Sequence, residues 1–292
     1  MKTEKRRFNK DFISGYLFIS PSLFFIIVFS IVPLLMVFFF SFQKYNVVQA
    51  PEFIGLENYK RMFSDPFMKP ALINTFIYTI ITVPIQTLLS LLIASIICRK
   101  IKSKIDGFVK SSMFVPVIAS AILVGAIWRI LLSTNDGIIN GYLNLIGIKS
   151  INWLGDKYLA LLSVCFLTIW KNVGYFMVIY IAGILDIPQN LYEAADVDGA
   201  DKYSKFINIT IPALKPINFL VIALGLIWAF QAFEIIYALT SGGPGTATIT
   251  LVYTIYNTAF RQFNMGFASA VSVLLFIIVL VVSILQKKIM KD

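Results

Sequence analysis

The stretch Glu193-Ala194-Ala195-Asp196-Val197-Asp198-Gly199-Ala200 is a polar island in the apolar second half of the chain. After a gap that ends at Asn208, the sequence Ile209-Thr210-Ile211-Pro212-Ala213-Leu214-Lys215-Pro216 leads into the next apolar segment. A connection between two membrane spans can be far shorter than this. The length and charge of the region therefore indicate a surface that contacts another molecule.

The same region has a predictable local structure. Pro188 suits the first turn of a helix, and Leu191, Ala194 and Ala195 recur at helical spacing. Asp198-Gly199 is typical of a turn, because glycine adopts a positive φ without a steric penalty. The pattern predicts a short helix, a bend at Gly199 and a second short helix over 201–208.

The composition places the chain among membrane proteins. It has 292 residues, of which 58% are hydrophobic and 14% charged, whereas about a quarter of a soluble domain is charged. The net charge of +10 could suggest a nucleic-acid partner. We expect no nucleic acid, because the basic residues lie beside the apolar segments, as the positive-inside rule requires.

Several kinds of chemistry are excluded by residue type. The chain has no histidine, so His-based zinc sites, His acid–base catalysis and Ser-His-Asp triads are not possible within it. It also lacks a Gly-rich phosphate loop of the Walker type. Cys98 and Cys165 lie in or beside apolar segments and imply no disulfide framework. We expect no catalytic residue, no metal site and no cofactor bound by this chain.

The hydropathy pattern predicts an all-α membrane protein. About 20 apolar residues are needed to cross the hydrocarbon core as a helix, and six segments qualify: 16–42, 72–98, 113–132, 158–184, 217–240 and 267–286. The expected organisation is an N-terminal tail (1–15), a six-helix transmembrane domain (16–286) and a C-terminal tail (287–292). The region 185–216, called the coupling loop below, lies between the fourth and fifth segments.

The positions of Lys and Arg predict the orientation. With the N-terminus in the cytoplasm, sixteen Lys and Arg residues fall in cytoplasmic segments and seven in external ones. This bias places both termini in the cytoplasm, together with the coupling loop.

The coupling loop also resembles a known motif. The pattern Glu193-Ala194-Ala195, then Gly199, then nine residues and Ile209-Thr210-Ile211-Pro212 resembles the EAA loop of ABC importer membrane subunits, with Ile211 where that family has leucine. An amphipathic linker is the simpler alternative. The resemblance implies that Glu193, Ala194, Ala195, Asp198, Gly199 and Ala200 form a coupling helix and bend that dock on an ATPase.

Two predicted external segments extend the resemblance. The sequence Phe53-Ile54-Gly55-Leu56-Glu57-Asn58-Tyr59 resembles the F-x-G-L-x-N-Y stretch of carbohydrate-type permeases. The loop 240–245 contains three glycines and a proline, so it cannot continue a helix. With the amphipathic segment 248–263, it resembles the external region before the last span of the same permeases. A generic surface turn and a simple re-entry loop are the alternatives.

The resemblance implies a type I ABC importer permease of the carbohydrate-uptake class, similar to maltose, multiple-sugar and glycerol-phosphate permeases. Such a chain would lie in the bacterial inner membrane. It would pair as a heterodimer with a second homologous permease, bind two ATPase subunits that hold ATP and Mg, and receive sugar from an extracytoplasmic substrate-binding protein.

Ionisable residues inside apolar segments usually face a bundle interior or a cavity. Lys171 lies in the fourth segment and Glu234 in the fifth, three residues after Gln231 and on the same expected helical face. Arg129 lies near the outer end of the third and could extend to the interface. A sugar path also needs aromatic faces. The candidate path residues are Trp170, Lys171, Tyr175, Trp228, Gln231, Glu234 and Tyr237, although a structural ion pair and ordinary aromatic packing are simpler interpretations.

Two alternatives remain open at this point. Within the ABC class, glycerol phosphate is a second substrate, because Lys171 could face a phosphate. An ion-coupled secondary transporter belongs to a different class and would use broken helices and buried carboxylates. Uptake that requires ATP and survives an ionophore distinguishes the two classes.

Overall fold

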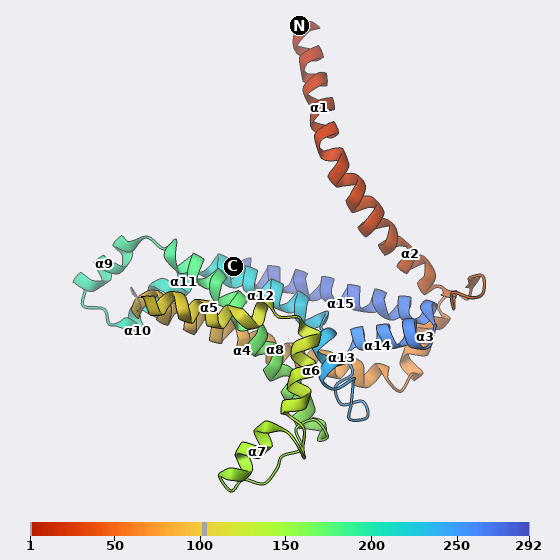
Figure 1. Cartoon of the computed structure of the whole chain (residues 1–292). Coiled ribbons are helices and arrows are strands. Elements are labelled where there is room, and N and C mark those ends of the chain that lie inside the picture. Colours follow the sequence, from red (N-terminus) through yellow and green to blue (C-terminus); the bar gives the residue numbers. More distant parts are fainter. Residues whose placement is uncertain (1, 101–103, 292) are drawn as a thin grey trace. The chain divides into compact units, whose positions relative to one another are not determined.

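The computed structural model describes residues 2–100 and 104–291. Within these residues the chain is mostly helical, with one two-stranded hairpin (Figure 1). Contacts group the described residues into two compact units, 2–62 with 257–274 and 63–256 with 275–291. Each unit is described by itself. The expected extent of the permease domain, 16–286, stays a prediction.

The first unit begins with a long apolar helical segment. Its elements are α1 (Lys2–Ile26), the π-helical turn η1 (Ile27–Ile31), α2 (Val32–Ser41), β1 (Gln43–Lys44), β2 (Glu52–Phe53), most of α3 (Glu57–Ser64), η3 (Asn257–Arg261) and the first residues of α15 (Met265–Lys291). The strands pair antiparallel, Gln43 with Phe53 and Lys44 with Glu52. Pro33 lies just after η1 and inside the continuous helical stretch Ser14–Ser41. Its missing N–H removes one helix hydrogen bond, and a π-helical turn is a common way to accommodate such a loss.

The second unit contains the remaining helices. They are α4 (Met68–Lys100), α5 (Lys104–Ile118), α6 (Ala121–Leu131), α7 (Ile138–Leu145), α8 (Lys157–Leu185), α9 (Gln189–Val197), α10 (Lys202–Lys205), η2 (Phe206–Thr210), α11 (Ile211–Ala213), α12 (Lys215–Phe230), α13 (Glu234–Leu239), α14 (Leu251–Tyr256) and the rest of α15. Within this unit α9 and α10 lie at the opposite end from α13 (Figure 1).

The core of the second unit lies between α4, α8 and α12. Large side chains such as Phe176, Met177 and Tyr180 are buried there with Leu91 and Val221. Glycines bring the helices close together, as is common in membranes, where apolar burial alone gives no preference for helix over lipid. A Cβ added at Gly174 of α8 would lie 2.0 Å from the carbonyl oxygen of Met113 on α5.

The structure confirms helices at all six predicted spans, but it breaks two of them. Four helical stretches are long and apolar enough to cross a membrane: Ser14–Ser41, Met68–Cys98, Lys157–Leu185 and Met265–Met290. The segment 113–132 is instead the pair α5 and α6, with a bend of 100° between Lys110–Ile118 and Ala121–Leu131. A second pair, Lys202–Ala213 and Lys215–Phe230, is bent by 69°. By length and composition the described residues therefore contain four helices that could cross a membrane, or up to six if each bent pair is one span.

The expected continuous helix over 217–240 is wrong. The helix α12 ends at Phe230 and α13 begins at Glu234, and Phe233 between them is non-helical, with φ −138° and ψ −56°. A break inside an apolar segment requires partners for the freed backbone groups. The Thr250 hydroxyl supplies one, since it donates to the Ala232 carbonyl at 3.2 Å. Because of the break, Gln231 and Glu234 do not share the face of one helix.

Candidate functional site

The coupling loop contains the two helices and the bend that the sequence predicts. The first helix is α9, with Pro188 as its N-cap residue. The Ala200 N–H donates to the Ala195 carbonyl at 2.8 Å, and Gly199 has a φ of +75°. A Cβ added at Gly199 would meet no described atom within 4 Å. Glycine is therefore favoured here by backbone conformation and not by lack of space.

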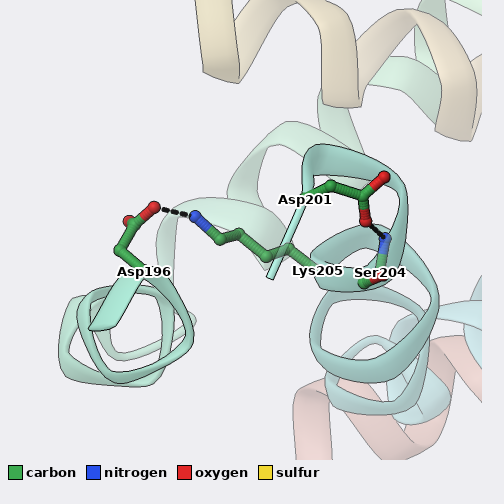
Figure 2. Close-up of polar contacts among 4 residues, drawn as sticks. All are labelled: Asp196, Asp201, Ser204 and Lys205. Carbon is green, nitrogen blue, oxygen red and sulfur yellow. Dashed lines mark hydrogen bonds and ion pairs between the residues drawn. The ribbon is translucent and has the colours of Figure 1, made fainter. Parts of the chain in front are cut away.

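The second helix begins at a capped residue and is longer than expected. It runs without a break through α10, η2 and α11, over Lys202–Ala213. The Asp201 carboxylate accepts a hydrogen bond from the Ser204 N–H at 2.9 Å (Figure 2), which is the standard way to cap the first turn. Hydrogen bonds from Ser204, from its side chain and then its N–H, lower the pKa of Asp201.

Two side-chain contacts connect the helices of the coupling loop. Lys205 Nζ donates to Asp196 Oδ1 across the gap between α10 and α9, as Figure 2 shows. The Tyr192 hydroxyl shares a hydrogen bond of 2.9 Å with Thr210 Oγ1. These contacts fix α9 against η2 and α10 without burying it.

The outer surface of α9 is free in this chain. None of its nine residues, all of which are described, is buried. Glu193 and Ala194 are exposed and Ala195 is half-buried, while Val197 is 88% exposed. Asp198, Gly199 and Ala200 continue this surface around the bend. A slim helix with small residues and two exposed acids, Glu193 and Asp196, is suited to a groove in another protein.

The second unit also contains a polar cavity of about 520 Å³, which is lined by residues other than those of the coupling loop. Ligand pockets commonly measure 300–1,000 Å³. The cavity is lined by Tyr78, Thr82, Gln86, Ala121, Thr168, Lys171, Asn172, Gly225, Trp228, Ala229, Gln231, Ala232, Phe233, Glu234 and Ile235. These residues come from α4, α6, α8, α12, α13 and the break between α12 and α13.

Both helix breaks reach this polar cavity. Ala121 begins α6 after the bend, and Ala232 lies between α12 and α13. Lys171 Nζ donates to the Val117 carbonyl at 3.1 Å, which is close to the end of α5. Charged and polar side chains thus supply partners where the backbone leaves the helix, as irregular backbone at membrane depth requires.

The structure brings four of the seven candidate path residues into the polar cavity: Lys171, Trp228, Gln231 and Glu234. Glu234 interacts electrostatically with Lys171. The other three lie elsewhere. Trp170 packs on Trp128, with ring centroids 5.7 Å apart, and lines a separate apolar pocket.

Tyr175 and Tyr237 lie in aromatic clusters behind or beside the cavity lining. The Tyr175 ring packs on Trp228 at 4.9 Å, so it supports a lining residue. Tyr237 packs on Phe233 at 5.4 Å and on Tyr256 at 5.5 Å. Arg129 is exposed in the last turn of α6. The role of every candidate in a substrate path stays a prediction.

Sequence reasoning missed the contribution of α4 to the cavity. Its lining residues there are Tyr78, Thr82 and Gln86, all 2% exposed or less. The signal was available, because polar residues at intervals of three or four within an apolar segment mark one face of a helix. Asn172, which follows Lys171 in the sequence and also lines the cavity, is not among the predicted path residues either.

The Phe53–Tyr59 motif has a structural role within the first unit. Gly55 adopts a φ of +60°. Buried Asn58 donates to the carbonyls of Ser41 at 3.0 Å and Gln43 at 2.8 Å, and the Tyr59 hydroxyl donates to Ser41 Oγ at 2.7 Å. The motif therefore anchors α3 to the end of α2. The loop 240–245 is also non-helical, as expected.

Comparisons with known proteins agree with one another. A permease of Bacillus subtilis (strain 168), described as probable ABC transporter permease protein YurN, is 36% identical over 97% of this chain and 98% of its own length. The trehalose/maltose transport system permease protein MalF of Thermococcus litoralis is 33% identical over 94% of this chain and 92% of its own length.

A solved structure shares the fold over nearly the whole chain. The crystal structure of a bacterial ABC transporter involved in the import of the acidic polysaccharide alginate contains a chain that is similar with a TM-score of 0.86 and 21% identity, over 98% of both chains. The family described as binding-protein-dependent transport system inner membrane component matches residues 69–291. This chain belongs to that family of transport permeases, whose members are inner-membrane components.

Proposed function

We propose that this chain is the membrane-spanning permease subunit of an ATP-driven, binding-protein-dependent importer of a sugar or oligosaccharide. The observation that carries the proposal is α9, a helix that two side-chain contacts connect to the rest of the coupling loop, and of which no residue is buried by the described part of the chain. In a chain of this family, that helix is the contact for an ATPase subunit. Family membership argues against the ion-coupled alternative, even though two helices are broken.

The sugar class follows from the relatives. Their names specify trehalose and maltose, arabinooligosaccharides and lactose. Glycerol phosphate is not favoured. The polar cavity combines amide groups, hydroxyl groups and the Trp228 face, and these are the groups that bind sugar hydroxyls and the apolar faces of sugar rings. We propose it as part of the translocation path.

The complex would contain a second homologous permease, two ATPase subunits that bind ATP and Mg, and an extracytoplasmic binding protein that delivers the sugar. Closure of the ATPase pair would push on α9. Because Lys205 and Tyr192 connect α9 to the helix that leads into α12, the push would reach the cavity as a rigid-body shift between two conformations.

Reconstitution tests the transport function. The complete complex with its binding protein is placed in liposomes and given labelled trehalose, maltose, lactose or glycerol 3-phosphate. We expect ATP-dependent uptake of a sugar that a protonophore leaves unchanged. Uptake that proceeds without ATP and stops with the protonophore would establish the ion-coupled class instead.

Thiol labelling tests six spans with both termini in the cytoplasm. Cysteines at Asn58, Asn152 and Thr246 should react with an impermeant reagent added outside intact cells, whereas a cysteine at Asn208 should not. Ser103 is also predicted to be cytoplasmic, but it lies outside the described residues. Labelling of Asn208 from outside would overturn both the orientation and the coupling role.

A further inference from the structure

A row of buried polar side chains runs along α4. Tyr78, Thr82, Gln86 and Ser90 follow one another at intervals of four, so they lie on one face of the helix. Each is at most 2% exposed. We call this set the α4 polar stripe. The first three members line the polar cavity.

Each hydroxyl group of the α4 polar stripe already donates a hydrogen bond within the protein. The Tyr78 hydroxyl donates to Thr168 Oγ1 at 2.9 Å, and the Thr82 hydroxyl donates to the Tyr78 carbonyl at 2.7 Å. The Ser90 hydroxyl donates to the Val173 carbonyl at 3.0 Å. A hydroxyl has one proton to donate. These neighbours therefore have no proton left for another acceptor.

Gln86 is the exception within the stripe. Its side chain is 1% exposed, and its Oε1 has no hydrogen-bond partner among the residues that the structure describes. Gly225 of α12 faces the other end of the amide, since an added Cβ would lie 3.0 Å from Nε2. Buried polar atoms are nearly always hydrogen-bonded, so an unmet acceptor beside a cavity needs an explanation.

We infer that the Gln86 amide oxygen accepts a hydrogen bond from a hydroxyl group of the transported sugar, and that Gln86 is a specificity-determining residue of the path. This inference rests on the proposed function. Gln86 lines the polar cavity, so its amide is placed to meet a ligand there. The stripe offers that ligand an acceptor, and a sugar hydroxyl supplies the proton donor that the Gln86 oxygen lacks.

The charges of the cavity agree with an uncharged substrate. Lys171 and Glu234 have opposite formal charges and interact with each other, and Lys171 also donates to the Val117 carbonyl. A carboxylate or phosphate group would itself bring only acceptors to the Gln86 oxygen, whereas a sugar hydroxyl brings a proton donor. The chemical class that fits is a neutral sugar with free hydroxyl groups.

The test uses the complete complex in liposomes. The probe is whichever of trehalose, maltose and lactose the wild-type complex imports fastest, together with its monodeoxyfluoro derivatives. Fluorine replaces a hydroxyl of similar size but donates no hydrogen bond. In wild type, we expect one derivative to lose about tenfold in uptake because its missing proton leaves Gln86 unmet.

Gln86→Met has a similar length and lacks the amide. In this variant, the parent sugar should lose about tenfold, and the sensitive derivative should lose nothing further, because both changes remove the same hydrogen bond. The binding protein is the same in both complexes, so its own preference among the derivatives cancels in the comparison. Equal losses across all derivatives in both complexes would overturn the inference.

Thr87 supplies a matched control on the same helix. Its Oγ1 is also buried without a hydrogen-bond partner among the described residues, but Thr87 does not line the cavity. Thr87→Val should leave uptake and the response to fluorine unchanged. If Thr87→Val reproduced the Gln86→Met pattern, the effect would belong to α4 packing and the inference would fail. If wild type imports no sugar at all, the proposed function fails first.

Discussion

The coupling loop and the polar cavity differ in where they hold their polar groups. The loop exposes its acids on α9, none of whose residues is buried among the described part of the chain, whereas α4 carries a buried row of hydroxyl and amide groups. Glycine shows the difference most clearly. Gly199 has open space and a positive φ, but Gly174 and Gly225 have helical neighbours in contact. The loop depends on backbone conformation, and the cavity depends on close packing.

Gly174→Ala should have the largest effect. The added Cβ would lie 2.0 Å from the Met113 carbonyl oxygen, and this is a backbone atom that cannot rotate away. We expect α5 and α8 to separate, with destabilisation of about 3 kcal/mol or more. Thermal unfolding of the detergent-purified protein measures it. Gly141→Ala is the control, since its added Cβ meets no described atom within 4 Å. Equal melting temperatures for the two variants would contradict the close packing.

Neutralising Lys171 and Glu234 should reduce transport without preventing assembly. Lys171→Met leaves the Val117 carbonyl without its donor and Glu234 without its cation. We expect uptake to fall on the order of 10- to 100-fold, the range for losing a hydrogen bond to a charged group. Lys171→Arg keeps a cationic donor and should retain more uptake. An ATPase assay measures coupling, and co-purification of the subunits measures assembly, so the two effects can be separated.

The double variant Glu234→Gln, Lys171→Met distinguishes a role of the pair in the substrate path from a purely structural role. If the pair only stabilises the bend between α5 and α6, unfolding should occur at lower temperature and uptake per assembled complex should be normal. Normal uptake by the assembled double variant would remove both residues from the path.

Gly199→Val should disturb the coupling loop alone. A β-branched residue at a φ of +75° costs about 1–3 kcal/mol, so α9 should lose its orientation while the cavity stays intact. Gly199→Asn is the matched variant, because asparagine tolerates the left-handed region and the space is open. We expect weaker ATPase co-purification for Val than for Asn. Glu193→Lys, which reverses the exposed charge, should also weaken it. Wild-type attachment in all three variants would make the loop a linker.

The coupling loop and the cavity also differ in how well the sequence predicts them. The bend at Gly199 and the helices beside it depend on local rules of φ and capping, and these rules can be applied to a few residues in order. The break after Phe230 depends on Thr250, which is eighteen residues beyond Ala232. No proline or glycine marks that break, so the apolar pattern predicts one continuous helix.

The candidate site divides in the same way. The coupling residues are adjacent in sequence and recognisable as a motif. The cavity joins α4 to α13. None of the lining residues predicted from the sequence comes from α4, since they come only from the fourth and fifth apolar segments and are Lys171, Trp228, Gln231 and Glu234. Trp170 and Asn172 lie two positions apart on α8, yet only Asn172 lines the polar cavity. Whether a residue of α8 lines the cavity depends on which face of the helix it occupies. The packing of α8 against α4 and α12 determines which face that is.

A charge exchange should have a smaller effect on the coupling loop. The Lys205 side chain is 14% exposed, but that of its partner Asp196 is 68% exposed, so solvent screens the pair. Ion pairs that solvent screens contribute about 0.2–1 kcal/mol. Asp196→Lys and Lys205→Asp should each lower the sugar imported per ATP hydrolysed, by less than Gly199→Val does. The double exchange should restore part of the ratio. Failure of the exchange to restore any of it would show that the contact does not position α9.

The smallest expected effect is the loss of the Asp201 cap. The pKa of Asp201 is lower in the folded protein than its ordinary value, so the cap contributes fully above that ordinary value, about 3.9, and is lost as the pH falls through the lower, folded-state pKa. Hydrogen exchange of the amides in 202–213, corrected for the intrinsic rate at each pH, should be a few-fold faster in Asp201→Ala than in wild type at neutral pH. Asp201→Asn caps without titrating, so its protection should match wild type at neutral pH and stay constant on acidification, while that of wild type declines. Because the carboxylate is at the surface and only the first turn depends on it, protection of α8 should not change in either variant. A pH-dependent loss of the same size in Asp201→Asn would assign the effect to another group of the coupling loop.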